Sequence, residues 1–554
     1  MALLRLAQVQ VFQHDTYARM AEDELRAVQQ VFGRRGALLD RNGNVLATSV
    51  DTWDVYVSVQ AWKDPAKAET AAAEMARALR LDKEQLKASV RAREFGDLLV
   101  SRDVAYETGR DLLKADLPGV VALPNSVRVN PDGDTGAAII GITGADNTGL
   151  AGMEDSQNEV LQGKPGRAIF ERDTTGEPIP FGTHITEDPQ QGKDIILTVD
   201  RFLQQLVERE LDLAVKEHRA RGGTIVVMDP NSGEILALAT SPRLKFSTLD
   251  LSDPEQLGLL KNSAVTDLYE PGSVMKVITA ASAIDAGVVS PWTTYTDTGV
   301  VKIYETELRN WDSQVYGEQT MTGVLQNSIN TGAVFMMQAM REQQFVAYLD
   351  KFGFGKPTGV ELQGEPGGIF RKPEDRGWTP VDPATQSFGQ SISVTPIQMV
   401  AAFSAAINGG NLLKPRLIKG VVGADGHIQA TAPAIVSQPI RPETSAAVRA
   451  MLEQVVMPPE RGHQGRPKLY TAGGKSGTAN IPVSNGYNDR QIASFIGFAP
   501  VESPRVVILV KLDDNADGLT GQVAAGPVFA RLVDQVLSFL DVQPAAAARV
   551  EAPR

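Results

Sequence analysis

Ser273 and Lys276 are the residues of this 554-residue chain whose spacing most directly suggests chemistry, because a serine with a lysine three residues later can pair a nucleophile with its base. No other serine in the sequence has a lysine at that distance. The chain breaks at Pro271-Gly272 and then shows helical apolar spacing, which predicts Ser273 at a helix N-terminus and Lys276 one turn along the same side. A serine that merely caps the helix would give the same pattern, so a structural role stays open.

A lysine can act as a base only as a neutral amine. The pKa of a free lysine is about 10.4, so neutrality at pH 7 costs roughly 4–5 kcal/mol. Burial, a helix N-terminus and a second cation can supply this shift. A second lysine about 5 Å away would contribute roughly 3 kcal/mol at an effective dielectric constant near 20. The hypothesis therefore requires another positive residue beside Lys276.

Lys475 is the candidate for that second cation. It begins Lys475-Ser476-Gly477-Thr478, the only Lys-[Ser/Thr]-Gly in the chain, within the strand-like segment AGGKSGTAN. The small residues around it would let a substrate backbone lie against the strand as an added β-strand. The alternative is an edge strand weakened by glycine, with a solvated lysine.

Ser328 and Asn330, in NSINTG, form the third and weakest pattern, Ser-x-Asn, because Ser156-Gln157-Asn158 also matches it. The location of Ser328 between the other two patterns, in a loop-like setting among helices, distinguishes it. Together, the order Ser-x-x-Lys, Ser-x-Asn, Lys-Ser-Gly predicts one serine acyltransfer site formed by three distant segments.

Other chemistries lack the residues they need. The chain has no cysteine, which excludes disulfides, thiolate metal sites and a cysteine nucleophile. Its five histidines are scattered and none belongs to an HExxH motif, so we expect neither a metal nor another cofactor. A formal charge of −13 without a basic run argues against nucleic-acid binding. The composition, 42% hydrophobic and 22% charged, is that of a globular protein.

The first 190 residues predict a mixed fold. Apolar residues between Asp15 and Phe32 recur at helical spacing. RGALLDRNGNVLATS predicts two short strands around Asn42-Gly43, and residues 65–94 are helix-like. GEPIPFGTHITEDPQQGKD has the composition of a linker or domain edge. No segment reaches the roughly 20 apolar residues of a membrane helix, and the N-terminus lacks a signal-peptide cleavage pattern.

The remaining residues predict an antiparallel sheet covered by helices. A helical stripe follows Asp194 and precedes the hairpin GTIVVMDPNSGEILALATSP. Much later come AGGKSGTAN, RQIASFIGFAP and RVVILVKL, three strand-like runs before an amphipathic last helix. Because a long helical stretch separates the two groups, we predict an α/β sandwich with a mostly helical insertion.

With these motifs, the chain resembles the class B penicillin-binding proteins, which are peptidoglycan D,D-transpeptidases. RGALLDRNGNVLA, GLAGMEDSQNEVLQGKPG and LTVDRFLQQLVE are similar to the N-terminal signatures of that class. YEPGSVMK, LQNSINTG, FGQSISVTPIQM and AGGKSGTAN are similar to its catalytic signatures. SFIGFAP and GQSISVTPIQMVAAFSAAINGG favour the septal, cell-division branch over the elongation branch.

The resemblance implies an α/β (α+β) multidomain fold with a β-lactamase-like transpeptidase domain. We expect a juxtamembrane helix at residues 1–33, an elongated N-terminal pedestal, similar to a dimerisation domain, at 34–192, the transpeptidase domain at 193–542 and a flexible tail at 543–554. Family members normally carry a membrane helix at the start, so we expect one upstream of Met1 in a longer form, with the catalytic domain outside the membrane.

The resemblance also implies roles for the site residues. Ser273 would be the acylated nucleophile and Lys276 its base, while Ser328 and Asn330 would relay protons and hold the substrate amide. Lys475 would tune the site electrostatically.

Ser476, Gly477 and Thr478 would bind the substrate, with Ser476 and Thr478 on its terminal carboxylate. The backbone N–H groups of Ser273 and Thr478 would form the oxyanion hole. The partners so implied are D-Ala-D-Ala stem peptides, β-lactams, a shape-and-division (SEDS) polymerase and other division proteins.

Two alternatives remain open. A D,D-carboxypeptidase or β-lactamase would use the same residues with water as the acceptor, although no signature of a deacylating base is apparent. A non-catalytic penicillin-binding receptor or division scaffold would not need an intact Ser273, Lys276 and Lys475.

Overall fold

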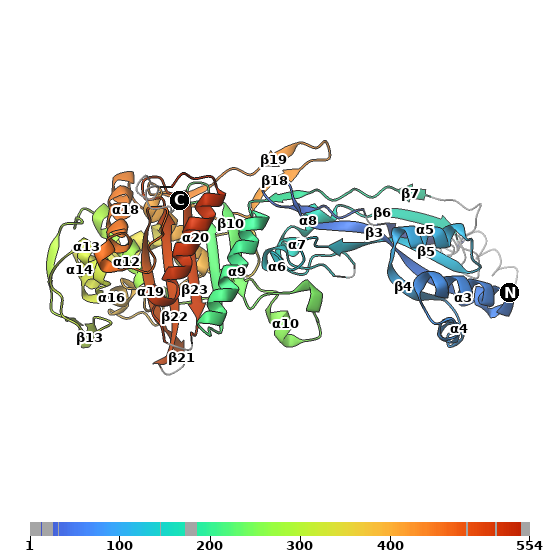
Figure 1. The fold of residues 1–554 in the computed structure, drawn as a ribbon, viewed down its shortest axis with the longest axis horizontal. Coiled ribbons are helices and arrows are strands. Elements are labelled where there is room, and N and C mark those ends of the chain that lie inside the picture. Colours follow the sequence, from blue (N-terminus) through green and yellow to red (C-terminus); the bar gives the residue numbers. More distant parts are fainter. Residues whose placement is uncertain are drawn as a thin grey trace, which may run out of the picture.

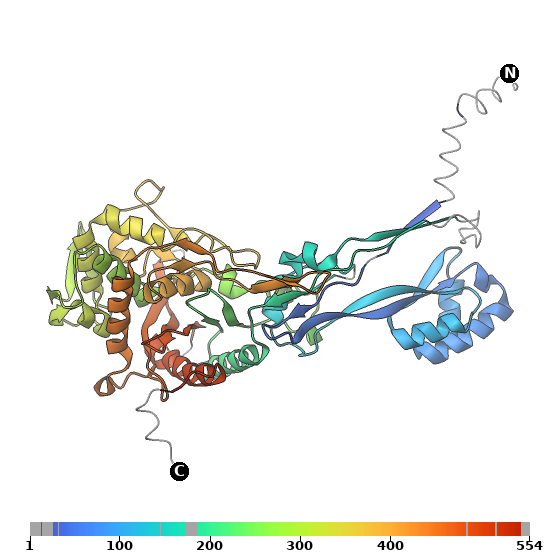
Figure 2. The same cartoon turned by 90° about the horizontal axis from the view of Figure 1, so that it is seen from above.

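The molecule is elongated, with a thick C-terminal unit at one end and the slender pedestal at the other (Figure 1). The structure is a computed structural model that describes residues 13, 26–31, 33–144, 146–171, 185–483, 486–515 and 518–544. Figure 2 shows the same arrangement from above, with the pedestal strands running along the long axis.

Within the described residues, the C-terminal unit is built on a five-stranded antiparallel sheet. Its strands, in spatial order, are β10 (Ile235–Ser241), β9 (Gly222–Met228), β23 (Val506–Asp513), β22 (Gly486–Ala499) and β21 (Gly473–Val483). Every residue of β9 is buried, because helices cover both faces of the sheet. The predicted sandwich is therefore confirmed, and β21, which carries Lys475, lies at the edge of the sheet.

Two amphipathic helices, α9 (Arg201–Glu217) and α20 (Gly526–Phe539), lie side by side against this sheet (Figure 1). The carboxylate of Asp200 caps α9 by accepting the N–H groups of Phe202 and Leu203. Val207 and Leu211 follow Leu203 on the buried face. This is the helical stripe predicted after Asp194.

Helices are the predominant regular structure of the insertion between β10 and β21, in line with the prediction. Its helices are α10 (Pro254–Gly258), α11 (Ser263–Thr266), α12 (Met275–Asp285), α13 (Met321–Asn327), α14 (Asn330–Met340), α15 (Glu342–Lys351), α16 (Asp382–Gln386), α17 (Pro396–Ile407) and α18 (Pro442–Val456). Between α12 and α13, β11 (Thr294–Asp297) pairs with β14 (Gly317–Thr320), and β12 (Val300–Ile303) pairs with β13 (Thr306–Arg309). A short helix, α19 (Gly521–Ala524), follows β23.

The pedestal contains the predicted hairpin. Strand β2 (Leu38–Leu39) pairs with β3 (Val45–Ser58) across a turn in which Gly43 has a φ of +88°. The carboxylate of Asp40 accepts the N–H groups of Asn42 and Asn44, which fixes this turn.

Long strands give the pedestal its length. Strand β3 pairs with β5 (Val120–Val129) and β4 (Asp97–Ala105), and α3 (Pro65–Leu79), α4 (Lys83–Arg91) and α5 (Tyr106–Lys114) pack around Trp62 and Met75.

One sheet joins the pedestal to the C-terminal unit. Strand β2 pairs in parallel with β8 (Ile195–Leu197), which pairs with β18 (Ile418–Val422), and β18 pairs with β19 (Ile428–Ala430). Residues more than 200 positions apart thus form one sheet and hold the two parts together.

The predicted helix over Asp15–Phe32 is wrong at its C-terminal end. Arg26–Val31 form strand β1, which pairs antiparallel with β6 (Gly166–Glu171), and β6 pairs with β7 (Ile185–Glu187). The apolar spacing of a short segment can fit both a helix and a strand. Here the segment forms a strand because the distant strand β6 pairs with it. The other residues of 1–33, apart from 13 and 33, lie outside the described residues, as do 545–554 of the predicted tail.

The predicted helix-like stretch at 65–94 is two helices. Helix α3 ends at Leu79 with Arg80 as a left-handed C-cap residue, and the carboxylate of Asp82 then caps α4. Among the described residues, no helix combines the length and the apolar character needed to cross a membrane.

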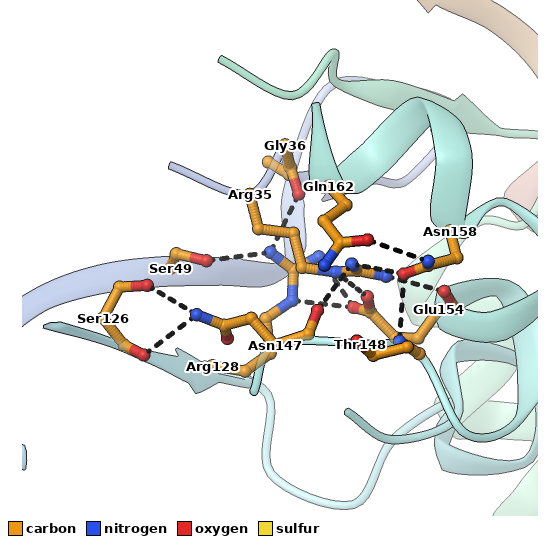
Figure 3. A network of polar contacts seen from close by, with 12 residues as sticks. Arg35, Gly36, Ser49, Ser126, Arg128, Asn147, Thr148, Glu154, Asn158 and Gln162 are labelled. Carbon is orange, nitrogen blue, oxygen red and sulfur yellow. Dashed lines mark hydrogen bonds and ion pairs between the residues drawn. The ribbon is translucent and has the colours of Figure 1, made fainter. Parts of the chain in front are cut away.

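A buried ion network holds the base of the pedestal (Figure 3). The carboxylate of Glu154, which is 1% exposed, lies between two guanidinium groups, 2.6 Å from Nε of Arg35 and 2.7 Å from Nε of Arg128. Arg35 also donates to the carbonyl oxygen of Asn147 and to Oδ1 of Asn158. The network connects the chain before β2, the end of β5 and helix α7 (Gly152–Ser156).

We expect Glu154→Ala to destabilise the protein by about 3–5 kcal/mol, because it leaves two buried guanidinium groups without their counter-charge. Urea unfolding followed by circular dichroism measures this loss. Glu74→Ala is the matched control, since Glu74 pairs with Arg77 at the surface and should change stability by less than about 1 kcal/mol. Equal urea midpoints for Glu154→Ala and Glu74→Ala would contradict the prediction.

Candidate functional site

Ser273 lies where a tight turn enters a helix. Residues Gly272–Val274 form a 3₁₀ turn that leads directly into α12, so Lys276 follows one turn later, as the spacing predicts. Gly272 has a φ of +56°, and a side chain there would contact the carbonyl oxygen of Thr478 at 3.0 Å. Glycine therefore permits the close approach of this turn to β21.

Lys276 is fully buried beneath Ser273. Its Nζ lies 3.1 Å from Oγ of Ser273 and 3.3 Å from Oγ of Ser328, and it donates to the carbonyl oxygen of Ser328 at 2.5 Å. One amine thus contacts two hydroxyl groups from segments more than 50 residues apart.

Ser328 and Asn330 occupy the junction of α13 and α14. Ser328 ends α13 in the left-handed conformation, with a φ of +56°, and Asn330 is the first residue of α14. The side-chain amide of Asn330 donates to the carbonyl oxygen of Arg309 at 2.9 Å. The loop-like setting predicted for this motif is present.

Lys475 is 2% exposed on β21, which rules out the alternative of a solvated lysine on an edge strand. Its Nζ donates to the carbonyl oxygen of Ser476 at 3.0 Å. On the same strand, a side chain at Gly477 would collide with Oγ of Ser494 and with the carbonyl oxygen of Pro271, so glycine is needed where the strand passes the turn before Ser273.

Burial shifts both lysines toward the neutral amine. The pKa of Lys276 lies well below its ordinary value, first because the group is buried and second because Lys475 is near, while Asp312 opposes the shift. Burial also lowers the pKa of Lys475 to about 7. Lys475 therefore lies near enough to lower the pKa of Lys276 when it is protonated, as the sequence hypothesis requires, and burial contributes more than its charge.

This shift predicts a pH-dependent stability. Between pH 7 and about 10.4 the unfolded chain keeps the proton on Lys475 and the folded protein has released it, so stability rises with pH in this window. Relative to Lys475→Met, the wild type should gain up to about 1.4 kcal/mol per pH unit. Urea unfolding of both proteins at pH 7, 8.5 and 10 measures the difference, and a difference independent of pH would contradict the prediction.

These residues surround a cleft of about 650 Å³. The predicted residues that line it are Ser273, Ser328, Asn330, Lys475, Ser476 and Thr478. Of the other two, Lys276 lies buried beneath Ser273, and Gly477 packs against Ser494. Within the described part of the chain, no three histidine or acidic side chains gather as a metal site would require.

Several cleft residues carry no signal of their own in the sequence. Arg309 ends β13 and Trp311 follows it, Gln390 comes from the loop before α17, and Thr520 and Gln522 come from the start of α19. Gln390 lies within FGQSISVTPIQM, so only the family signature pointed to it. The N–H group of Gly521 donates to Oγ1 of Thr478 at 3.1 Å, which connects α19 to the site strand.

Two family models match the chain. Residues 223–534 match the family model described as the penicillin-binding protein transpeptidase domain. Residues 30–197 match the model described as the penicillin-binding protein dimerisation domain.

Curated relatives match along the whole chain. Stage V sporulation protein D of Bacillus subtilis is 33% identical over 547 residues, which cover 98% of this chain and 83% of the relative. Peptidoglycan D,D-transpeptidase FtsI of Escherichia coli is 31% identical over 552 residues, covering 98% and 89% of the two chains. Among solved structures, penicillin-binding protein 2X of Streptococcus thermophilus superimposes with a TM-score of 0.81 at 25% identity, covering 93% of this chain and 81% of that one.

Proposed function

The chain belongs to the class B penicillin-binding proteins, a family of peptidoglycan D,D-transpeptidases, and on that premise we propose that it cross-links stem peptides through an acyl-enzyme on Ser273. The observation that carries this proposal is the 3.1 Å separation between Oγ of Ser273 and Nζ of Lys276, whose pKa is lowered. A serine hydroxyl becomes a good nucleophile only beside a base that can take its proton.

In the first half-reaction, the neutral amine of Lys276 takes the proton of Ser273, and Oγ attacks the carbonyl carbon of the penultimate D-Ala. In this proposal the backbone N–H groups of Ser273 and Thr478 form the oxyanion hole, an effect worth about 3–4 kcal/mol for one donor. Ser328, 3.3 Å from Nζ of Lys276, passes a proton to the leaving D-Ala, and the peptide bond breaks.

Strand β21 orients the substrate. Ser476 and Thr478 line the cleft beside Ser273 and bind the terminal carboxylate, and the cationic form of Lys475 attracts it. Asn330 holds the substrate amide. In the second half-reaction, an amine of a neighbouring stem peptide attacks the acyl-enzyme and releases Ser273.

The same reaction makes the enzyme a β-lactam target, because a β-lactam acylates Ser273 but leaves no departing fragment, so the adduct persists. We also propose a septal role, which rests on SFIGFAP and GQSISVTPIQM, with a SEDS-family polymerase and other division proteins as partners. Since peptidoglycan is assembled outside the cytoplasmic membrane, we place the catalytic domain there, anchored to that membrane.

Mapping the covalent adduct tests the acyl-enzyme. After reaction of the full chain with a fluorescent penicillin, trypsin should release residues 262–276 with the penicilloyl mass added, and fragmentation should place it on Ser273 rather than Ser263. An adduct on any other residue, or none, would overturn the proposal. Incubation with a D-Ala-D-Ala peptide and an acceptor amine should release one D-Ala for each peptide bond formed.

The hydrolytic alternatives give a different result. A β-lactamase would turn over a chromogenic cephalosporin rapidly, whereas the transpeptidase should hydrolyse it slowly and retain a stable adduct. A D,D-carboxypeptidase would release D-Ala with water as the acceptor, independently of the amine. A non-catalytic scaffold would neither cross-link peptides nor release D-Ala.

A further inference from the structure

Helix α14, which begins with Asn330, has no N-cap side chain of its own. Its N-cap residue is Ile329, whose side chain has no oxygen to accept a hydrogen bond. Instead, Oδ1 of Asn310 accepts the N–H groups of Asn330 at 3.1 Å and Thr331 at 3.3 Å. Asn310, 20 residues earlier in the chain and only 3% exposed, caps this helix from outside it.

Asp297 fixes the orientation of Asn310. The Asn310 amide nitrogen donates to Oδ2 of Asp297 at 2.9 Å, so its oxygen must face the helix. Asp297 is 1% exposed and also accepts the hydroxyl of Thr331 at 2.6 Å and the N–H groups of Gly299 and Tyr316. Burial raises the pKa of Asp297, but these hydrogen bonds outweigh burial and leave that pKa below its ordinary value, which keeps the carboxylate charged.

What this pair holds is the start of the Ser328–Asn330 segment. Ser328 has a φ of +56°, a conformation that costs a non-glycine residue energy and must be imposed by its surroundings. Its carbonyl oxygen accepts from Nζ of Lys276 at 2.5 Å, and the Asn330 amide is bonded to the residue next to Asn310, Arg309. A shift of the α14 N-terminus would therefore move both Ser328 and Asn330 relative to Lys276.

We propose that Asn310 and Asp297 are positioning residues of the transpeptidase, which set the geometry of Ser328 and Asn330 over Lys276. Asp297 itself does not contact the substrate. The inference rests on the proposed function, because it concerns the acylation of Ser273. Since a displacement of about 1 Å in a catalytic group can cost about 100-fold in rate, Asn310→Ala should lower the acylation rate constant about 10–100-fold.

The experiment follows labelling by a fluorescent penicillin over time and separates the rate constant from the final amplitude, which counts folded molecules. Asn310→Ala should label slowly to full amplitude. Asn262→Ala is the matched control, because Asn262 is an equally buried asparagine that caps α11 away from the cleft. It should lower the melting temperature and leave the rate constant unchanged.

A reciprocal exchange of the two side chains tests the contact itself. Asn310→Asp keeps an acceptor for α14 but places a second carboxylate against Asp297, and it should be as slow as Asn310→Ala. Adding Asp297→Asn restores a hydrogen-bond donor between the two positions and should raise the acylation rate constant at least about 5-fold. The recovery should be partial, because the new amide group is itself a donor and faces the N–H group of Tyr316.

The outcomes are distinct. A wild-type acylation rate constant for Asn310→Ala overturns the inference. An Asn310→Asp variant whose rate constant does not rise when Asp297→Asn is added also overturns it. This second comparison can be made even if Asn310→Ala does not fold. Wild-type protein that takes no label at Ser273 would instead overturn the proposed function.

Discussion

Ser273→Ala is expected to lose covalent labelling by a fluorescent penicillin altogether, while the folded protein still binds the compound reversibly. Alanine has no Oγ, so no ester can form at this position. If water attacked the penicillin instead, the product would leave the protein without a covalent label. Strand β21, which we propose binds the substrate carboxylate, does not depend on that oxygen, so Lys475 and Thr478 stay in place beside the cleft. Fluorescence in a denaturing gel measures the covalent adduct, and a fluorescence polarisation titration measures reversible binding.

Ser282→Ala is the matched control for this variant. Ser282 lies on α12, the helix that follows the turn of Ser273; it is fully buried and donates to the carbonyl oxygen of Ile278 at 2.7 Å. It should label like the wild type, so that any loss in Ser273→Ala reports the nucleophile and not damage to the helix. Equal labelling of Ser273→Ala and the wild type would show that another residue is acylated.

The proximity of Ser273 and Lys276 could be predicted from the sequence because helix geometry alone imposes it. Residues three apart lie on one side of a helix, and Pro271-Gly272 indicates where the helix begins. The strand around Lys475 was predictable for a similar local reason, since short glycine-rich and apolar runs separated by turn residues favour strands. Local patterns thus determine the two strongest parts of the site.

The third motif shows where such patterns lose their power. Ser156-Gln157-Asn158 matches the Ser-x-Asn pattern of Ser328-Ile329-Asn330. It lies in the pedestal, where Oδ1 of Asn158 accepts hydrogen bonds from Arg35 and Gly149. The order of the three motifs along the chain favours Ser328 over Ser156, and the tertiary fold then brings the junction of α13 and α14 to Lys276.

Features that depend on distant partners were beyond sequence reasoning. Strand β1 exists because β6, about 140 residues later, supplies its hydrogen bonds. Trp311 and Thr520 line the cleft, and Asn310 caps α14, but the periodicity of the local sequence predicts none of these positions. In each case a backbone or side-chain group is satisfied by a residue whose position only the assembled fold determines.

Lys276→Met is expected to lower the rate constant of Ser273 acylation about 10²–10⁴-fold, the contribution of a well-placed general base. Methionine has a similar length and fills the space of a side chain that is fully buried. It also removes a group that is costly to bury, so the melting temperature should not fall. Stopped-flow measurement of penicillin acylation gives the rate constant, and thermal unfolding reports stability.

Lys276→Arg separates the base from the charge. A guanidinium group stays protonated in proteins, so it cannot take the proton of Ser273 even where it reaches Oγ. If Lys276 acts as the base, arginine and methionine should both be slow, despite their opposite charges. A Lys276→Arg enzyme that acylates within about 10-fold of the wild type would mean that the site requires only a cation 3.1 Å from Oγ, and the neutral-amine mechanism would be wrong.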